Sequence, residues 1–339
     1  NVYDLSASVS DGSLSASKDF MVTVTNDTSD DITTEGDDGT YIGAGPIQGA
    51  TVCIEATAGT CTGAEFTTTT AQDGTFSLTV DSGTSGVIRG EGGFDPVTNL
   101  QFSANSSFAL GQPVTDQNFA VTPLSTIMNA YNNNTEYETF KSKLGLASTY
   151  MIRYNNPFTG LGAAALNKAA VVNTQILVMH ELLSEIHTFS DDSAANKIAA
   201  AIYTRAGTET SLGDTTFIKD MLTNLDSDFS PTSDQLVSLS AGISAYMQKI
   251  NANSSNSHSH FAKTGVSELK DLMKGIMDGT SSSEEIDKLV FNTINWINEN
   301  TSWDGGSITD NEASLSETTY ALSNNGSSNY IVDNINTKD

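Results

Sequence analysis

Basic residues are scarce in this sequence. Lysine and arginine together number 15 in a chain of 339 residues, against 41 aspartates and glutamates, which gives a formal net charge of -26. Nucleic acids and anionic membranes are bound largely through Lys and Arg, so we expect neither as a partner. The many carboxylates suit a protein exposed to salt and offer ligands for Ca²⁺. A solvated acidic surface without a specific ion site is the alternative.

Long apolar runs and catalytic motifs are missing as well. No apolar stretch is long enough for a membrane-spanning helix, so we expect no direct membrane insertion. The opening NVYDLSASVSDG has neither the basic nor the apolar region of a signal peptide, so an exported form would be a mature or trimmed chain. The motifs G-x-S-x-G, H-E-x-x-H and the P-loop are absent, which predicts a protein that is not an enzyme.

Cysteine is limited to two residues, Cys53 and Cys61, which lie close together within a predicted β-hairpin. This arrangement predicts a disulfide and therefore an oxidising compartment, extracellular or at the cell surface. The loop it would close is short, so the chain-entropy relation gives a stabilisation of about 2–3 kcal/mol. A pair of free thiols is the alternative, whereas a metal site would need further Cys or His residues nearby.

The two halves of the chain differ in composition. Residues 1–120 are rich in Thr, Gly, Ser and Asp, whereas residues 121–300 carry Leu, Ile, Met and Ala at helical spacing. This change predicts an α+β multidomain protein in which β structure precedes a helical bundle. We expect five segments: a strand pair, an acidic linker, a β-sandwich, a helical bundle and a polar tail, at residues 1–26, 27–40, 41–122, 123–300 and 301–339.

The first segment alternates apolar and polar residues in VYDLSASVS and again in FMVTVTN, which predicts two strands. The pair resembles the last two strands of a cadherin-like or immunoglobulin-like repeat. Two strands alone bury too little surface to be stable. The chain is therefore either a fragment of a longer protein, or these strands complete a sheet elsewhere in the chain or in a neighbouring subunit.

The segment DTSDDITTEGDDGT at 27–40 is predicted to be an acidic linker. Calcium at this junction would neutralise and stiffen the crowded carboxylates. The candidate ligands are Asp27, Asp30, Asp31, Asp37 and Asp38. A flexible, self-repelling linker without an ion is the alternative, and the spacing does not match an EF-hand loop.

Residues 41–122 contain short alternating stretches separated by glycine-rich turns, which predicts a sandwich. Asp73-Gly74 predicts a hairpin turn, and the glycines at 90–93 predict a bulge or a close backbone approach. GATV followed by TAQDGTFSLTV resembles the carboxypeptidase-regulatory-like, transthyretin-like β-sandwich. GEGGFDP and VTPLST extend this resemblance to a longer module of large bacterial exported proteins, in which a helical domain follows. The resemblance implies a surface-protein spacer without catalytic residues.

Helical periodicity begins at Pro123, which suits a first helical turn. Apolar stripes predict long helices at 163–188, 233–250 and 284–298, and shorter ones near 194–205, 215–225 and 266–278. Residues 251–263 are predicted to be an exposed loop. In the tail, TTYALS and NYIVDNI flank SNNGSS, which predicts a second stray hairpin.

The histidines offer little chemistry. His180 and His187 flank the apolar stripe of one helix, where core or boundary positions are favoured over metal ligation, and Glu181 and Glu185 are predicted to be solvated. For His258 and His260, an exposed loop is favoured over adventitious Zn²⁺. Trp296 is more consistent with helix packing than with sugar stacking.

These observations favour a non-enzymatic extracellular structural protein, either a self-assembling filament subunit or a segment of a cell-surface adhesin. Subunit contacts by β-strand addition would explain the strands at the two ends. A homopolymer or another surface protein is the expected partner, with calcium as the one possible cofactor. The alternative is a glycan- or peptide-binding module on a surface stalk. A hydrolase would need a polar pocket for which no motif is present.

Overall fold

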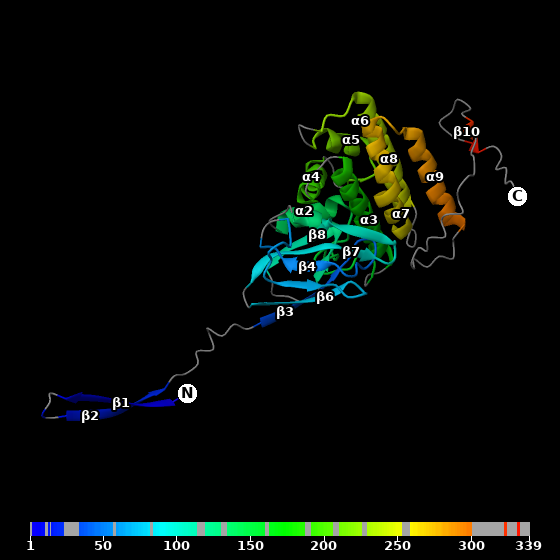
Figure 1. Ribbon diagram of the computed structural model, residues 1–339. Helices are drawn as coiled ribbons and strands as arrows, with labels where there is room; N and C mark the ends of the chain where they lie inside the picture. Colours follow the sequence, from blue (N-terminus) through cyan, green and yellow to red (C-terminus); the bar gives the residue numbers. More distant parts are fainter. Residues whose placement is uncertain are drawn as a thin grey trace.

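The computed structural model describes most of the chain between the N-terminal strands and the last helix. The described residues are 2–10, 13, 15–23, 34–56, 59–81, 84–113, 119–129, 134–159, 163–186, 191–205, 210–225, 229–252, 258–299, 322–323 and 331–332. They form a mixed α+β fold in which the two larger sheets precede the helices, as the composition predicts. Figure 1 shows the two larger sheets at one end of the main body and the helices at the other.

Two sheets make up the β part. The three-stranded sheet has the order β6-β3-β9 and the four-stranded sheet the order β5-β4-β7-β8. Their strands are β3 (Thr34–Tyr41), β4 (Thr51–Ile54), β5 (Thr67–Thr69), β6 (Thr75–Asp81), β7 (Ser85–Asp95), β8 (Leu100–Pro113) and β9 (Phe119–Val121).

Strand β3 changes the expected boundary of the β part. Residues 34–40, which the sequence assigns to the acidic linker, pair antiparallel with β6, and Gly39–Tyr41 pair in parallel with β9. Close packing explains the composition of this strand, because a Cβ at Gly39 would lie 2.5 Å from the Phe76 ring. The strand therefore carries glycine where alternating apolar residues would otherwise mark it.

Tyr41 connects the two sheets. Its ring lies 5.7 Å from the ring of Phe108 on β8, and its hydroxyl donates a hydrogen bond to the Gly90 carbonyl on β7 at 2.8 Å. A Cβ at Gly90 would lie 2.4 Å from the Tyr41 ring, and the β7–β8 register shifts between Glu91 and Gly93. The predicted close approach and the predicted bulge are both confirmed.

The turn at Asp73-Gly74 is also confirmed, but it joins different sheets. Gly74 has φ 74°, and the Asp73 carboxylate accepts hydrogen bonds from the Thr75 amide and hydroxyl. The strands on either side, β5 and β6, belong to the four-stranded and the three-stranded sheet respectively. The turn is thus a connection between two sheets and not a hairpin.

The helical part begins at α1. The helices are α1 (Pro123–Met128), α2 (Asn134–Lys143), α3 (Ala163–Ile186), α4 (Asp191–Thr204), α5 (Thr215–Thr223), α6 (Ser233–Ala252), α7 (His258–Thr264), a π-helical turn (Gly265–Leu269), α8 (Lys270–Asp278) and α9 (Ser283–Glu299). The predicted helices are confirmed to within a few residues, and α2 and α7 are additions to them. Among the described residues, no helix combines the length and the hydropathy needed to cross a membrane.

Helix α3 is the central element. Its residues from Ala169 to Leu183 are buried, and it contacts α1, α4, α6, α7 and α8. The predicted solvated position of Glu181 is therefore wrong, since only 7% of this residue is exposed. Asn173 of α3 accepts a hydrogen bond from the Leu124 amide and donates one to the Gly43 carbonyl, which links the helices to the β part. One hydrophobic cluster runs through both parts.

The end segments form two further small sheets. Strands β1 (Val2–Ser10) and β2 (Ser15–Thr23) pair antiparallel in a sheet of their own, as predicted. Strands β10 (Leu322–Ser323) and β11 (Ile331–Val332) form the tail pair that the sequence predicts. Figure 1 shows the β1–β2 pair apart from the main body.

Candidate functional site

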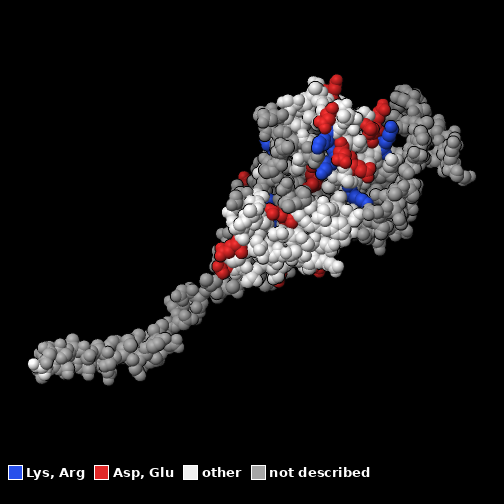
Figure 2. Space-filling view, in the orientation of Figure 1, with Lys and Arg blue, Asp and Glu red and all other residues white. Residues whose placement is uncertain are grey.

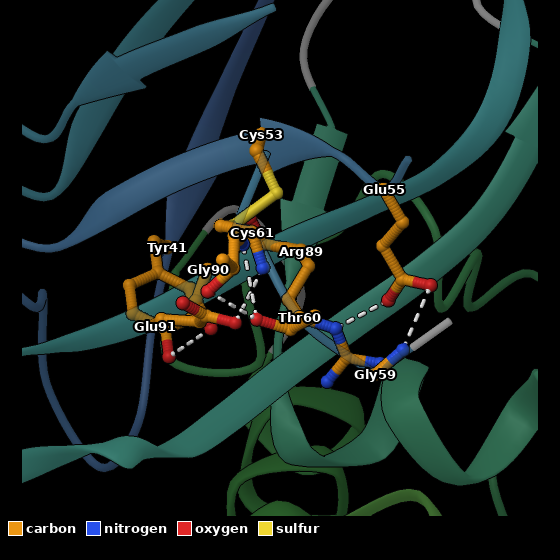
Figure 3. The surroundings of a disulfide bond; sticks show 10 residues. Tyr41, Cys53, Glu55, Gly59, Thr60, Cys61, Arg89, Gly90 and Glu91 are labelled. Atoms are coloured by element: carbon orange, nitrogen blue, oxygen red, sulfur yellow. Dashed lines mark hydrogen bonds and ion pairs between the residues drawn. A yellow bond between two sulfur atoms is a disulfide. The ribbon is translucent and has the colours of Figure 1, made fainter. Parts of the chain in front are cut away.

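The predicted disulfide is confirmed. Cys53 on β4 is bonded to Cys61, with a Cα–Cα distance of 5.6 Å (Figure 3). Cys61 lies in the connection between β4 and β5, which pair antiparallel as the predicted hairpin. Because Cys53 has no exposed surface and Cys61 only 8%, the bond is shielded from solvent reductants. Its burial favours a structural bond over a redox-active one.

A buried ion pair lies beside the disulfide. Arg89 on β7 is paired through Nε with Glu55 Oε1, and the two side chains are only 1% and 7% exposed. Glu55 Oε2 also accepts a hydrogen bond from the Gly59 amide at 3.2 Å, and Glu91 accepts one from the Cys61 amide at 2.7 Å (Figure 3). The two carboxylates thus hold Gly59 and Cys61, near the C-terminal end of the loop that the disulfide closes.

Sequence analysis missed this ion pair, although a signal was present. Arg89 interrupts the apolar run GVIRG, and Glu55 directly follows TVCI, so both lie where buried strand residues are expected. A charge in such a position needs a partner. The arrangement neutralises the buried charge of Arg89 and ties Glu55 to the loop closed by the disulfide.

The junction VTPLST closes one edge of the four-stranded sheet. Ser125 Oγ donates to the Ala109 carbonyl at 3.0 Å, and Thr126 Oγ1 accepts from the Ala109 amide at 2.9 Å. Thr122 and Ser125 also form a reciprocal capping box at the start of α1. At Ala109, the two hydroxyls therefore supply the hydrogen bonds that a neighbouring strand would otherwise make to β8.

The other sheet edges differ in how far they are covered. The amide of Ala120 on β9 donates to the Arg153 carbonyl at 2.8 Å, so this edge is covered by the segment after α2. Strand β5 has three residues, and β6 has seven. Among the edge strands of the two larger sheets, β8 contacts α1, and β6 is the longest of the others. The described part of the structure supplies no strand on the outer side of β6.

Two histidines lie in places that the sequence did not predict. Residues 258–264 form α7, and His258 and His260 are 2% and 5% exposed, so the expected exposed loop is wrong there. Burial lowers the pKa of both imidazoles to about 4, with Lys263 as a lesser cause for His260. Neither ring nitrogen of His258 has a hydrogen-bond partner among the described residues. His180 is buried in α3, as a core position requires, and His187 lies outside the described residues.

The predicted calcium ligands fall mostly outside the described residues. Asp27, Asp30 and Asp31 belong to the undescribed stretch, while Asp37 and Asp38 lie in β3, where Asp38 is exposed. Within the described ranges, no three His, Cys, Asp or Glu residues are grouped so as to hold a metal ion. The calcium site therefore stays a prediction.

A groove of about 870 Å³ lies between α4 and α5. Phe217 and Met221 line it with apolar surface, and Lys197, Arg205 and Asp220 are its charged residues. Arg205 is paired with Asp214 at 2.7 Å and with Asp220 at 3.5 Å. The groove combines features that suit a peptide or another small ligand, and it was not predicted because its residues are dispersed over two helices.

Comparison with known protein families, with characterised proteins and with solved structures gave no match.

Proposed function

We propose that this protein is a non-enzymatic structural component of a cell surface, either a self-assembling filament subunit or a segment of an adhesin. The two sheets are assigned to a transthyretin-like or immunoglobulin-like sandwich, and the helices to a bundle packed against it. A shared core and the Asn173 hydrogen bonds to Leu124 and Gly43 support a single rigid unit. The buried disulfide supports an extracellular location.

The observation that carries the proposal is the β1–β2 pair. The register joins Tyr3 to Val22 and Leu5 to Phe20, which are positions on one face of the pair, whereas Ser8 and Ser17 share the other face. A two-stranded hairpin with one apolar face is marginally stable in water on its own. We infer that a second copy of the chain covers this face, so that copies join head to tail.

Sedimentation velocity and negative-stain electron microscopy over a range of concentrations test the proposal. The wild-type protein is expected to form oligomers or filaments. The double substitution Leu5→Asp/Phe20→Asp should abolish them, whereas Ser8→Asp/Ser17→Asp adds the same charge on the opposite face and should have a smaller effect. A wild-type chain that stays monomeric with residues 1–26 ordered within its own fold would overturn assembly.

The second candidate function is ligand binding on a surface stalk, and the α4–α5 groove supports it. Its apolar residues Phe217 and Met221, with the cation Lys197 beside them, suit a peptide that carries an apolar side chain and a carboxylate. Titration with a library of acidic peptides, followed by anisotropy, would test this function. Lys197→Glu should weaken any binding at least about tenfold, and an unchanged affinity would exclude the groove.

A further inference from the structure

The proposed assembly requires an acceptor edge, and strand β6 has the open backbone for it. The Tyr41 amide donates to the Gly74 carbonyl at 2.8 Å, which makes Tyr41 and Gly74 a hydrogen-bonded pair next to Thr40–Thr75, the last pair of the β3–β6 ladder. Hydrogen-bonded pairs alternate with non-bonded ones in an antiparallel ladder. The N–H and C=O groups of Ser77 and Thr79 therefore point away from β3, toward the open side of the sheet.

The side chains of β6 are arranged for an added strand. Phe76, Leu78 and Val80 are buried, whereas Thr75, Ser77 and Thr79 are exposed. Natural edge strands are commonly protected by lysine, proline or a bulge. The sequence TFSLTVD has no lysine or proline, and its pairing with β3 runs without a register shift.

Strand β1 has the matching pattern. Its apolar residues Tyr3, Leu5, Ala7 and Val9 alternate with polar ones, so they would continue the buried face of Phe76, Leu78 and Val80. Strand β2 carries Lys18, which disfavours it as the pairing edge. On the face drawn in Figure 2, the described surface over the sheets is mainly uncharged.

We propose that β1 of one copy pairs with β6 of the next and extends the three-stranded sheet to the order β2-β1-β6-β3-β9. The inference rests on the proposed function, and it names the contact that the function needs. Within one copy, β1 and β6 belong to separate sheets, so donor and acceptor are both available to neighbours. Each copy then has one donor hairpin and one acceptor edge, which gives head-to-tail growth.

Proline at the outward positions tests the edge. Ser77→Pro removes an N–H that points away from β3, so the β3–β6 hydrogen bonds remain. We expect a folded monomer by circular dichroism and an assembly concentration raised by at least about tenfold. Ser77→Lys should act in the same direction. The matched control Thr69→Lys, on the short edge strand β5, should assemble like the wild type.

A mixing experiment distinguishes this inference from the proposed function. Leu5→Asp/Phe20→Asp lacks the donor and keeps the acceptor, whereas Ser77→Pro lacks the acceptor and keeps the donor. Each should be monomeric alone, and the mixture should give a one-to-one dimer and no longer species. If Ser77→Pro assembles like the wild type, or if the mixture stays monomeric, β6 is not the acceptor. A wild-type protein that never assembles would instead overturn the proposed function.

Discussion

A fully buried arginine destabilises a fold unless its charge is neutralised. Arg89 is among the largest side chains with almost no exposed surface in the described part of the chain, and Glu55 is its partner. Such a pair contributes little relative to apolar residues of similar size, but breaking it leaves an unpaired buried charge. Its value here lies in position, because Glu55 also holds the loop next to the disulfide.

The ion pair makes a prediction about stability. Arg89→Met should lower the free energy of unfolding by about 3–5 kcal/mol, because the Glu55 carboxylate loses its counter-charge. The double variant Arg89→Met/Glu55→Leu removes both charges and should recover most of this loss. Urea unfolding followed by circular dichroism measures each step. Equal losses in the single and double variants would mean that the charges are not coupled.

The disulfide is expected to contribute a smaller amount. Cys53→Ala/Cys61→Ala should lower the free energy of unfolding by about 2–3 kcal/mol, as the short loop implies. Denaturation with and without reductant checks this. The wild type should lose stability in reductant once unfolding exposes the bond, whereas the double alanine variant should be insensitive. A variant as stable as the oxidised wild type would show that Glu55 and Glu91 suffice to hold the loop.

The buried histidines predict a loss of stability in acid. The pKa of His258 and of His260 is lowered from 6.5 to about 4 by burial, so these imidazoles bind protons more readily in the unfolded chain. Their contribution is complete above pH 6.5 and is lost progressively as the pH falls toward 4. We expect each imidazole to account for at most about 3 kcal/mol across that window.

Thermal unfolding from pH 7.5 to 4 measures this effect against a matched variant. His258→Leu/His260→Leu removes both imidazoles and should flatten the slope between pH 6.5 and 4. The carboxylates titrate in both proteins, and burial raises the pKa of Asp95, which acts in the opposite direction to the histidines. Identical slopes in the two proteins would assign the acid sensitivity to carboxylates alone.

At the scale of elements, the junction between β8 and α1 is held by hydroxyl groups. Ser125→Ala should lower the free energy of unfolding by about 1–2 kcal/mol, because it removes the capping box and leaves the Ala109 carbonyl without its donor. Thr139→Ala removes an exposed hydroxyl from α2 and should stay within about 0.5 kcal/mol of the wild type. A similar small loss for Ser125→Ala would mean that water replaces the hydroxyl.

The elements that could be predicted are those whose buried residues recur at the regular spacing of a helix or a strand. Helix α9 shows it, since Ile286, Leu289, Val290 and Thr293 are buried as its stripe predicts. Strand β3 could not be predicted, because packing against Phe76 requires glycine where an apolar residue would have marked a strand. Helix α7 was not predicted for a related reason. Its buried face includes His258 and His260, which lie in a stretch whose sequence resembles a polar loop.

In the candidate site, too, one part could be predicted from the sequence and another could not. Cys53 and Cys61 were predictable because two cysteines close in sequence have few other uses in an oxidised protein. The Arg89–Glu55 pair joins residues of neighbouring strands, and its partnership depends on the register of β4 against β7. Register is set by tertiary packing. A charged residue in a strand therefore indicates that a partner is needed, but its sequence position does not identify that partner.

At the scale of the whole molecule, the net charge of -26 opposes the association of copies. We expect added NaCl to lower the assembly concentration, since the Debye length falls from about 30 Å at 0.01 M to about 8 Å at 0.15 M ionic strength. Light scattering at fixed protein concentration measures the effect. Assembly that weakens with salt would mean that attraction between opposite charges, and not strand pairing, joins the copies.

Adding calcium to the same experiment distinguishes general screening of the negative charge from binding at a specific calcium site. If Asp27, Asp30, Asp31, Asp37 and Asp38 bind the ion, CaCl₂ should promote assembly more than NaCl at equal ionic strength and should raise the melting temperature until chelator is added. Asp30→Asn/Asp31→Asn should remove the difference between the salts and leave the NaCl response unchanged. Because this segment joins the hairpin to β3, a bound ion would also stiffen the link between donor and acceptor in each copy. Superimposable curves for the two salts would leave a solvated acidic segment whose only effect is repulsion.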